Sequence, residues 1–286
     1  MTEALALPEL LAGGAAFSRD AAKKLCSESC RPYHAAWSTL RQIGVITGAR
    51  TDQDFYQAHI APLAANSSRV LISGAADYAI AEQVLMAFRS VSTKPEITVA
   101  DTCATTLAQN RWYAEQLGIS VRLIQSNIRE LRESARYDLI TTHSMLSFLP
   151  AGEHAGLFSV WRKLLAPNGH LVFVQGFRPH HANNAELRLD EQEIERFVKR
   201  SMVRYRGSSL SPEISEDEMA ALAIEFARAK HLHIVNDADR LQAALGEAGF
   251  KIDIWEILTR DGLPYRSSLA DEKDHALSLR VVAHAA

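Results

Sequence analysis

Short apolar runs separated by segments of helical periodicity are the feature that most limits how this sequence can fold. The runs VLIS (70–73), ITVA (97–100) and LVFV (171–174) are uninterrupted, which is typical of strands that are buried on both faces. Strands of this kind, with helices between them, form a parallel sheet that helices cover on both sides, so the expected fold class is α/β. The expected strands of this part are 69–73, 96–100, 120–125, 137–142 and 170–175.

Two stretches interrupt this pattern. The first 65 residues contain no clear strand, and their helical spacing is clearest at 20–26, 33–43 and 52–64. Residues 178–235 are typical of two amphipathic helices joined by the turn-rich segment RGSSLSPEIS. We expect a helical N-terminal cap over residues 1–65 and a helical insertion over residues 178–235, after the fifth strand.

A helix and two strands close the chain. The helix Ala238–Ala248 ends at Gly249, and the strands KIDIWEIL (251–258) and 277–283 follow, with a long connection between them. Together with the first five strands they predict one sheet domain over residues 66–286.

Composition and charge narrow the class of protein. Hydrophobic residues make up 47% and charged residues 23% of the chain, as in ordinary globular proteins. The net charge of −3 lacks the basic footprint of a nucleic-acid-binding protein. No apolar stretch is long enough to span a membrane, and the N-terminus has no basic leader before its apolar residues, so we expect a cytoplasmic protein.

The three cysteines, Cys26, Cys30 and Cys103, are an odd set, which argues against a disulfide framework and for a reducing compartment. The spacing Cys26-x3-Cys30 has no second cysteine pair. His231 and His233 have no cluster of carboxylates or cysteines beside them. We therefore expect no metal site.

The turn after the first strand, SGAADY (73–78), is where the glycine pattern of a dinucleotide-binding site would lie. Of the dinucleotide-binding glycines only Gly74 is present, because Ala76 and Ala79 occupy the other two places. Asp77 adds a negative charge where a diphosphate would lie, and a P-loop lysine is missing. These residues disfavour NAD, FAD and ATP, and they favour a nucleoside with a cationic tail.

Two further strand ends support that interpretation. Asp101 ends the second strand, where a carboxylate can accept hydrogen bonds from both ribose hydroxyls. Asn127 follows the third strand, where its amide can pair with an adenine edge.

At this point the sequence resembles the class I S-adenosylmethionine-dependent methyltransferases over about residues 66–286. The resemblance is carried, in order, by VLISGAADY, VADTC, SNIREL, YDLITTHSMLSFLP and WRKLLAPNGHLVFV. The chain departs from the family pattern at Ile72, Ala76, Tyr78 and Asn127. The resemblance implies a Rossmann-like, doubly wound, seven-stranded sheet that binds S-adenosyl-L-methionine and releases S-adenosyl-L-homocysteine.

The resemblance also implies roles for individual residues. Gly74 and Ala75 would approach the methionine moiety, and Asp77 would face its ammonium or sulfonium side. Asp101 and Thr102 would hold the ribose. Asn127 and Ile128 would flank the adenine. His143 would lie near the methionine part and the transferable methyl group.

His143 is the candidate catalytic base, because histidine titrates near neutral pH; the alternative is that it only packs at the end of the fourth strand. Tyr33 and Trp37 share a helix and are candidates for a lid over the methyl donor, although ordinary helix packing would also explain them. The remaining candidate acceptor-binding residues are Arg178 and His180, after the fifth strand, and Tyr205, in the insertion.

The expected activity is methyl transfer to an oxygen or nitrogen atom of a small-molecule acceptor, because the sequence lacks a basic stripe and its helical insertion would enclose a small acceptor. The alternatives are a methyltransferase that acts on a protein or nucleic acid, a cofactor-binding module without turnover, and a nicotinamide oxidoreductase. The covering segments also suit self-association as a homodimer.

Overall fold

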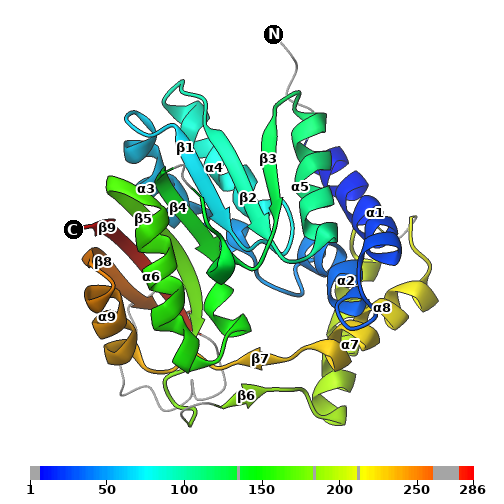
Figure 1. Cartoon of the computed structure of the whole chain (residues 1–286). Coiled ribbons are helices and arrows are strands. Elements are labelled where there is room, and N and C mark those ends of the chain that lie inside the picture. The colour runs from blue at the N-terminus through cyan, green and yellow to red at the C-terminus, as the bar shows by residue number, and fades with distance from the viewer. Residues whose placement is uncertain (1–6, 134–135, 183–184, 211–212, 260–276) are drawn as a thin grey trace.

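A seven-stranded mixed sheet forms the centre of the molecule (Figure 1), with the strand order β3-β2-β1-β4-β5-β9-β8. The computed structural model describes residues 7–133, 136–182, 185–210, 213–259 and 277–286. Strands β1 to β5 are parallel, and β9 is antiparallel to both of its neighbours. The strands are β1 Arg69–Ser73, β2 Glu96–Asp101, β3 Val121–Gln125, β4 Tyr137–His143, β5 Leu165–Phe177, β8 Phe250–Leu258 and β9 Leu277–Ala285. This confirms the Rossmann-like, doubly wound α/β fold.

Helices cover both faces of the sheet, as Figure 1 shows. Val70 and Ile72 of β1 pack on one helical layer and Leu71 packs on the other, because successive side chains of a strand point to opposite faces. The first layer consists of α3 Gln53–Ala64, α4 Ala79–Ser90 and α5 Ala104–Gln116, and the second of α6 His154–Leu164 and α9 Ala238–Glu247. Short 3₁₀ turns in the described part of the chain are η1 Ala49–Asp52, η2 Ile128–Glu130, η3 Met145–Phe148 and η4 Ala151–Glu153. Most of the long connection between β8 and β9 (260–276) lies outside the described residues.

The cap and the insertion form a helical lobe with a core of its own. This lobe contains α1 Leu7–Leu25, α2 Arg31–Gln42, α7 Glu191–Arg206 and α8 Glu216–Ala229. A two-stranded ribbon, β6 Glu186–Leu187 and β7 Leu232–His233, joins α7 and α8 to the sheet domain (Figure 1). Helix α3 belongs instead to a layer of the sheet, although it lies within the first 65 residues.

Helix α1 begins much earlier than the periodicity predicted, at Leu7 rather than near residue 20. Gly13 and Gly14 lower the local helical propensity, but they allow the helix to approach the aromatic side chains of its neighbours. A Cβ atom on Gly14 would lie 2.5 Å from the hydroxyl oxygen of Tyr78, and one on Gly13 would lie 3.3 Å from the ring of Trp112. Tertiary packing therefore sets the length of α1. Within the described ranges, no helix is both long enough and apolar enough to span a membrane.

Candidate functional site

A cleft of about 410 Å³ opens at the carboxyl ends of β1 to β4, between the sheet and the helical lobe. A cleft at this edge is where ligands bind in open α/β sheets, and its volume is within the range of roughly 300–1,000 Å³ that is usual for small-molecule sites. The predicted site residues that line it are Tyr33, Trp37, Gly74, Ala75, Asp77, Asp101, Thr102, Asn127, Ile128 and His143.

The turn after β1 depends on Gly74. Its φ of +71° lies in the left-handed region, which side chains other than glycine rarely adopt. A Cβ atom there would lie 2.5 Å from Sδ of Met145. The turn therefore brings the backbone to the floor of the cleft, where a ligand could approach it closely.

Asp101 links the loops that follow β1 and β2. Its Oδ2 accepts a hydrogen bond from the Ala75 N–H at 2.9 Å, and its Oδ1 accepts one from the Cys103 N–H at 2.7 Å. Burial raises the pKa of this carboxyl above its usual range, against the lowering effect of the two N–H groups. Each oxygen keeps a further lone pair for a ligand donor such as a hydroxyl group.

Asp77 also lines the cleft, but its charge is matched inside the protein. Its Oδ2 lies 2.7 Å from Nε of Arg41, and Asp77 is 3% exposed. Its Oδ1 accepts a hydrogen bond from the Ala79 N–H, at the start of α4. The structure therefore assigns this carboxylate to joining α2 and α4, and its expected contact with a cationic ligand stays a prediction.

Asn127 begins the turn η2. Its Oδ1 accepts a hydrogen bond from the Arg129 N–H at 3.1 Å, and its Nδ2 donates to Glu130 at 3.3 Å. These bonds fix the orientation of the amide at the rim of the cleft. The next residue, Ile128, is 3% exposed and packs in the core beneath the cleft.

His143, at the end of β4, is held by Asp52. Its Nε2 lies 3.2 Å from Oδ2 of Asp52, whose Oδ1 accepts hydrogen bonds from Ser278 and Arg280 at 3.1 Å each. Burial alone would raise the pKa of Asp52, but His143 and Arg280 outweigh it and hold that pKa below the ordinary value of 3.8. A carboxylate that orients a histidine is a common arrangement for a general base. Sequence reasoning missed Asp52, because it appeared there only as the first residue of the helical stretch 52–64.

Aromatic side chains form one wall of the cleft. The ring of Tyr33 stacks on Trp37 and Phe226, with centroids 5.1 Å and 5.3 Å away, and meets the edge of Phe148. Burial, with the charges of Asp77 and Asp101, raises the pKa of the Tyr33 phenol well above its ordinary value. Tyr33 therefore stays protonated, as a wall of the cleft and a hydrogen-bond donor, and cannot serve as a base near neutral pH.

Three predicted acceptor-binding residues do not line this cleft. Tyr205 is 2% exposed, and its hydroxyl donates to the carbonyl of Ile214 in the core of the lobe. Arg178 and His180 follow β5, where the Arg178 N–H donates to the carbonyl of Val235. The insertion instead reaches the cleft through Ala229 and His231. Sequence patterns did not indicate that these two residues reach the cleft, because only the tertiary position of the end of α8 and of the segment after it brings them there.

No protein-family model matches the chain, and no curated protein matches it in sequence. Solved structures match its fold. An S-adenosylmethionine-dependent methyltransferase from Clostridium acetobutylicum aligns with 87% of this chain and 97% of its own, with a TM-score of 0.55 and 9% identity. Magnesium protoporphyrin IX methyltransferase from Synechocystis, with bound S-adenosylhomocysteine, aligns with 96% of this chain and 100% of its own, with a TM-score of 0.51 and 12% identity.

A third similar structure is an amino pentose methyltransferase from Micromonospora echinaspora with bound S-adenosylmethionine. It aligns with 87% of this chain and 96% of its own, with a TM-score of 0.51 and 14% identity. The chain therefore has the fold of these S-adenosylmethionine-dependent methyltransferases.

Proposed function

We propose that this protein is an S-adenosylmethionine-dependent methyltransferase that acts on a small-molecule acceptor. The observation that carries the proposal is Asp101, which lies at the carboxyl end of β2 with both oxygens fixed by backbone N–H groups. A fixed carboxylate at this place suits the two hydroxyls of a ribose. Two of the solved structures with this fold hold S-adenosylmethionine or S-adenosylhomocysteine.

The donor groups around the cleft fit such a cofactor. Asp101 would accept hydrogen bonds from the ribose, with Thr102 beside it, and Asn127 and Ile128 would flank the adenine. The turn at Gly74 would leave room for the methionine part of the cofactor. A side chain at this position would instead enter that space and contact Met145. When bound, the cofactor supplies a methyl group on a positively charged sulfur. The residues of the chain would align the acceptor with it and exclude water, which can contribute most of the rate enhancement.

His143 and Asp52 support an acceptor with a hydroxyl or amine group. The acceptor atom must lose a proton when it is methylated, and a histidine beside the cleft can take it. Asp52 would hold the imidazole by its Nε2. Tyr33, Trp37 and Phe148 form an aromatic wall of the cleft, and a volume of about 410 Å³ suits a small acceptor rather than a polymer.

Calorimetric titration with S-adenosylhomocysteine tests the cofactor. We expect saturable binding by the wild-type chain, and Asp101→Ala should weaken it by about 1.5–3 kcal/mol, the contribution of hydrogen bonds to a charged group. Asp217→Ala, an exposed acid on α8, is the matched control. Equal affinity in the wild type and Asp101→Ala, or tighter binding of a nicotinamide dinucleotide, would overturn the proposal.

The acceptor class needs its own assay. Release of S-adenosylhomocysteine should appear with a hydroxyl- or amine-bearing small molecule and not with RNA, DNA or unfolded protein. Turnover on a polymer, with the steep salt dependence of phosphate contacts in the case of a nucleic acid, would support the polymer alternative. Cofactor binding without turnover on any acceptor class would favour a binding module.

A further inference from the structure

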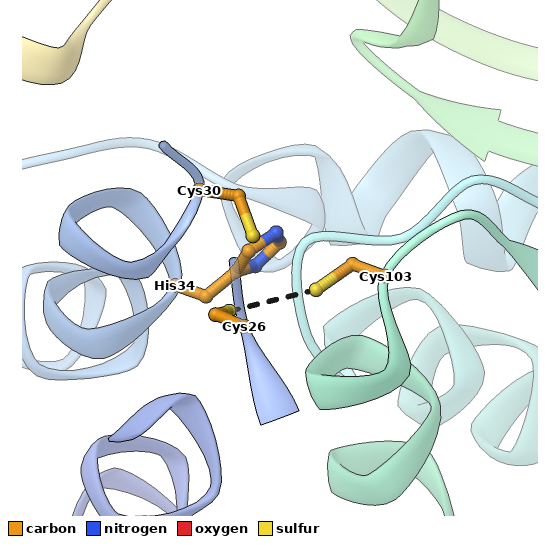
Figure 2. Close-up of side chains that lie close together, drawn as sticks. All are labelled: Cys26, Cys30, His34 and Cys103. Carbon is orange, nitrogen blue, oxygen red and sulfur yellow. Dashed lines mark hydrogen bonds between the residues drawn. The ribbon is translucent and has the colours of Figure 1, made fainter. Parts of the chain in front are cut away.

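All three cysteines of the chain meet at one place, although sequence spacing gave no sign of it. Cys26 follows the end of α1, Cys30 precedes α2, and Cys103 precedes α5. His34, in the first turn of α2, joins them, and Figure 2 shows the four side chains pointing toward one another. Three of the four come from the helical cap, and Cys103 comes from the loop after β2.

The distances suit a single ion. The four ligand atoms all lie within 4.8 Å of one another, and Sγ of Cys26 lies 3.6 Å from Sγ of Cys103. Two sulfur atoms on a tetrahedral zinc ion, each at about 2.3 Å from it, are about 3.8 Å apart. The sulfur pair is therefore already close to the spacing that zinc requires, and small side-chain rotations would complete the set.

We propose that Cys26, Cys30, His34 and Cys103 form a tetrahedral Zn²⁺ site that fastens the helical cap to the loop after β2. Three thiolates and one imidazole are a ligand set that selects zinc. Binding would release the thiol protons to water, so a higher pH favours it. Four protein ligands leave no open position, so the ion is structural.

The position of the site gives it a consequence for the cleft. Cys103 is two residues beyond Asp101 and donates its N–H to that carboxylate, while Cys30 and His34 line the cleft themselves. The ion would hold the backbone around Asp101 and the start of α2 in one arrangement. The proposal itself stands on the four ligands, whatever the cleft binds.

Metal analysis of the full chain tests the site. The chain purified under reducing conditions without chelator should carry one zinc ion, and the metal-free chain should take up Co²⁺ with the visible bands of tetrahedral coordination and a sulfur-to-cobalt charge-transfer band. Cys30→Ser is the chosen variant, because serine is a favourable residue before a helix and should preserve α2. It should weaken zinc affinity by at least about 100-fold, since loss of a ligand exceeds loss of an outer partner. The matched control is His59→Ala on α3, which should bind zinc as the wild type does.

The outcome that overturns the proposal is equally defined. If the wild-type chain binds Zn²⁺ or Co²⁺ no more tightly than the Cys30→Ser variant does, the chain has no such site. Thiol titration of the folded chain gives a second measurement: zinc should protect all three cysteines from a thiol reagent. Full reactivity with zinc present, or a Cys26–Cys103 disulfide whose reduction restores no metal binding, would also refute it.

Discussion

Arg41 and Asp77 form an ion pair of 2.7 Å between α2 and the turn after β1, and neither side chain is more than 4% exposed. Removal of one charge from such a pair leaves the other buried without compensation, which costs about 3–5 kcal/mol. Arg41→Met should therefore lower the free energy of unfolding by about that amount in urea titrations. The double variant Arg41→Met, Asp77→Asn should recover much of the loss.

Arg206→Met is the control for this pair, because Arg206 and Glu216 form an ion pair with side chains that are more than half exposed. Exposed pairs contribute little, so the urea midpoint should hardly move. An equal loss in Arg41→Met and Arg206→Met would show that the buried pair has no special role in joining the lobe to the sheet.

Asp52 should make the stability of the fold depend on pH in the acidic range. Its pKa is lower in the folded chain than its ordinary value of 3.8, because His143 and Arg280 outweigh the effect of burial. Its contribution to stability is therefore present above that ordinary value and is lost as pH falls through the lower, folded value. In Asp52→Asn the urea midpoint should fall less steeply below about pH 4 than in the wild type.

Asp54→Asn is the control for the pH dependence due to Asp52. Asp54 also pairs with Arg280, but its side chain is 69% exposed. Its acid profile should follow that of the wild type. Parallel profiles for wild type and Asp52→Asn would contradict the assignment.

His143 should matter for turnover rather than for folding. A base that removes the acceptor proton contributes about 10²–10⁴-fold, so His143→Gln should lower kcat by about 100-fold or more once an acceptor is in hand. The pH–rate profile should lose its acidic limb, which a merely structural histidine would leave in place. If the pH–rate profile of His143→Gln matched that of the wild type, His143 would not be the base. Catalysis would then depend on the alignment of the acceptor with the cofactor alone.

Gly74→Ala should strain the turn after β1. Its left-handed φ costs an alanine about 1–2 kcal/mol, and the new Cβ would meet Sδ of Met145. We expect a lower melting temperature and weaker S-adenosylhomocysteine binding by calorimetry. Adding Met145→Ala should relieve the contact but not the backbone strain, so recovery should be partial. Gly156→Ala, in α6 with nothing near its Cβ position, should melt no lower than the wild type.

The sheet could be predicted because its signals are local. Uninterrupted apolar runs such as 70–73 and 171–174 identify strands without any knowledge of their partners. Strand β5 begins earlier than expected, at Leu165 rather than His170, because the left-handed Asn168 lets the chain pair with Tyr137 ahead of the apolar run. Asp101 and Gly74, which the resemblance assigns to the cofactor, both line one cleft, and their roles toward a cofactor stay predictions.

The remaining features depend on residues that are distant in the sequence. Asp52 and His143 are 91 positions apart, and no periodicity connects them. Cys103 is also remote from Cys26, by 77 positions, so the cysteine spacing near the N-terminus showed only part of the set. The same holds for His231, which the course of the insertion brings to the cleft.

The short ribbon of β6 and β7 has a consequence for how such a protein can diverge. Helices α7 and α8 leave and rejoin the rest of the chain side by side, so their sequences can change without altering the register of any strand in the main sheet. The packing of α7 and α8 against α2 shapes one wall of the cleft. Ala229, at the end of α8, and His231, just after it, line that wall. Evolution can therefore remodel that wall while Gly74 and Asp101, at the carboxyl ends of β1 and β2, keep their geometry.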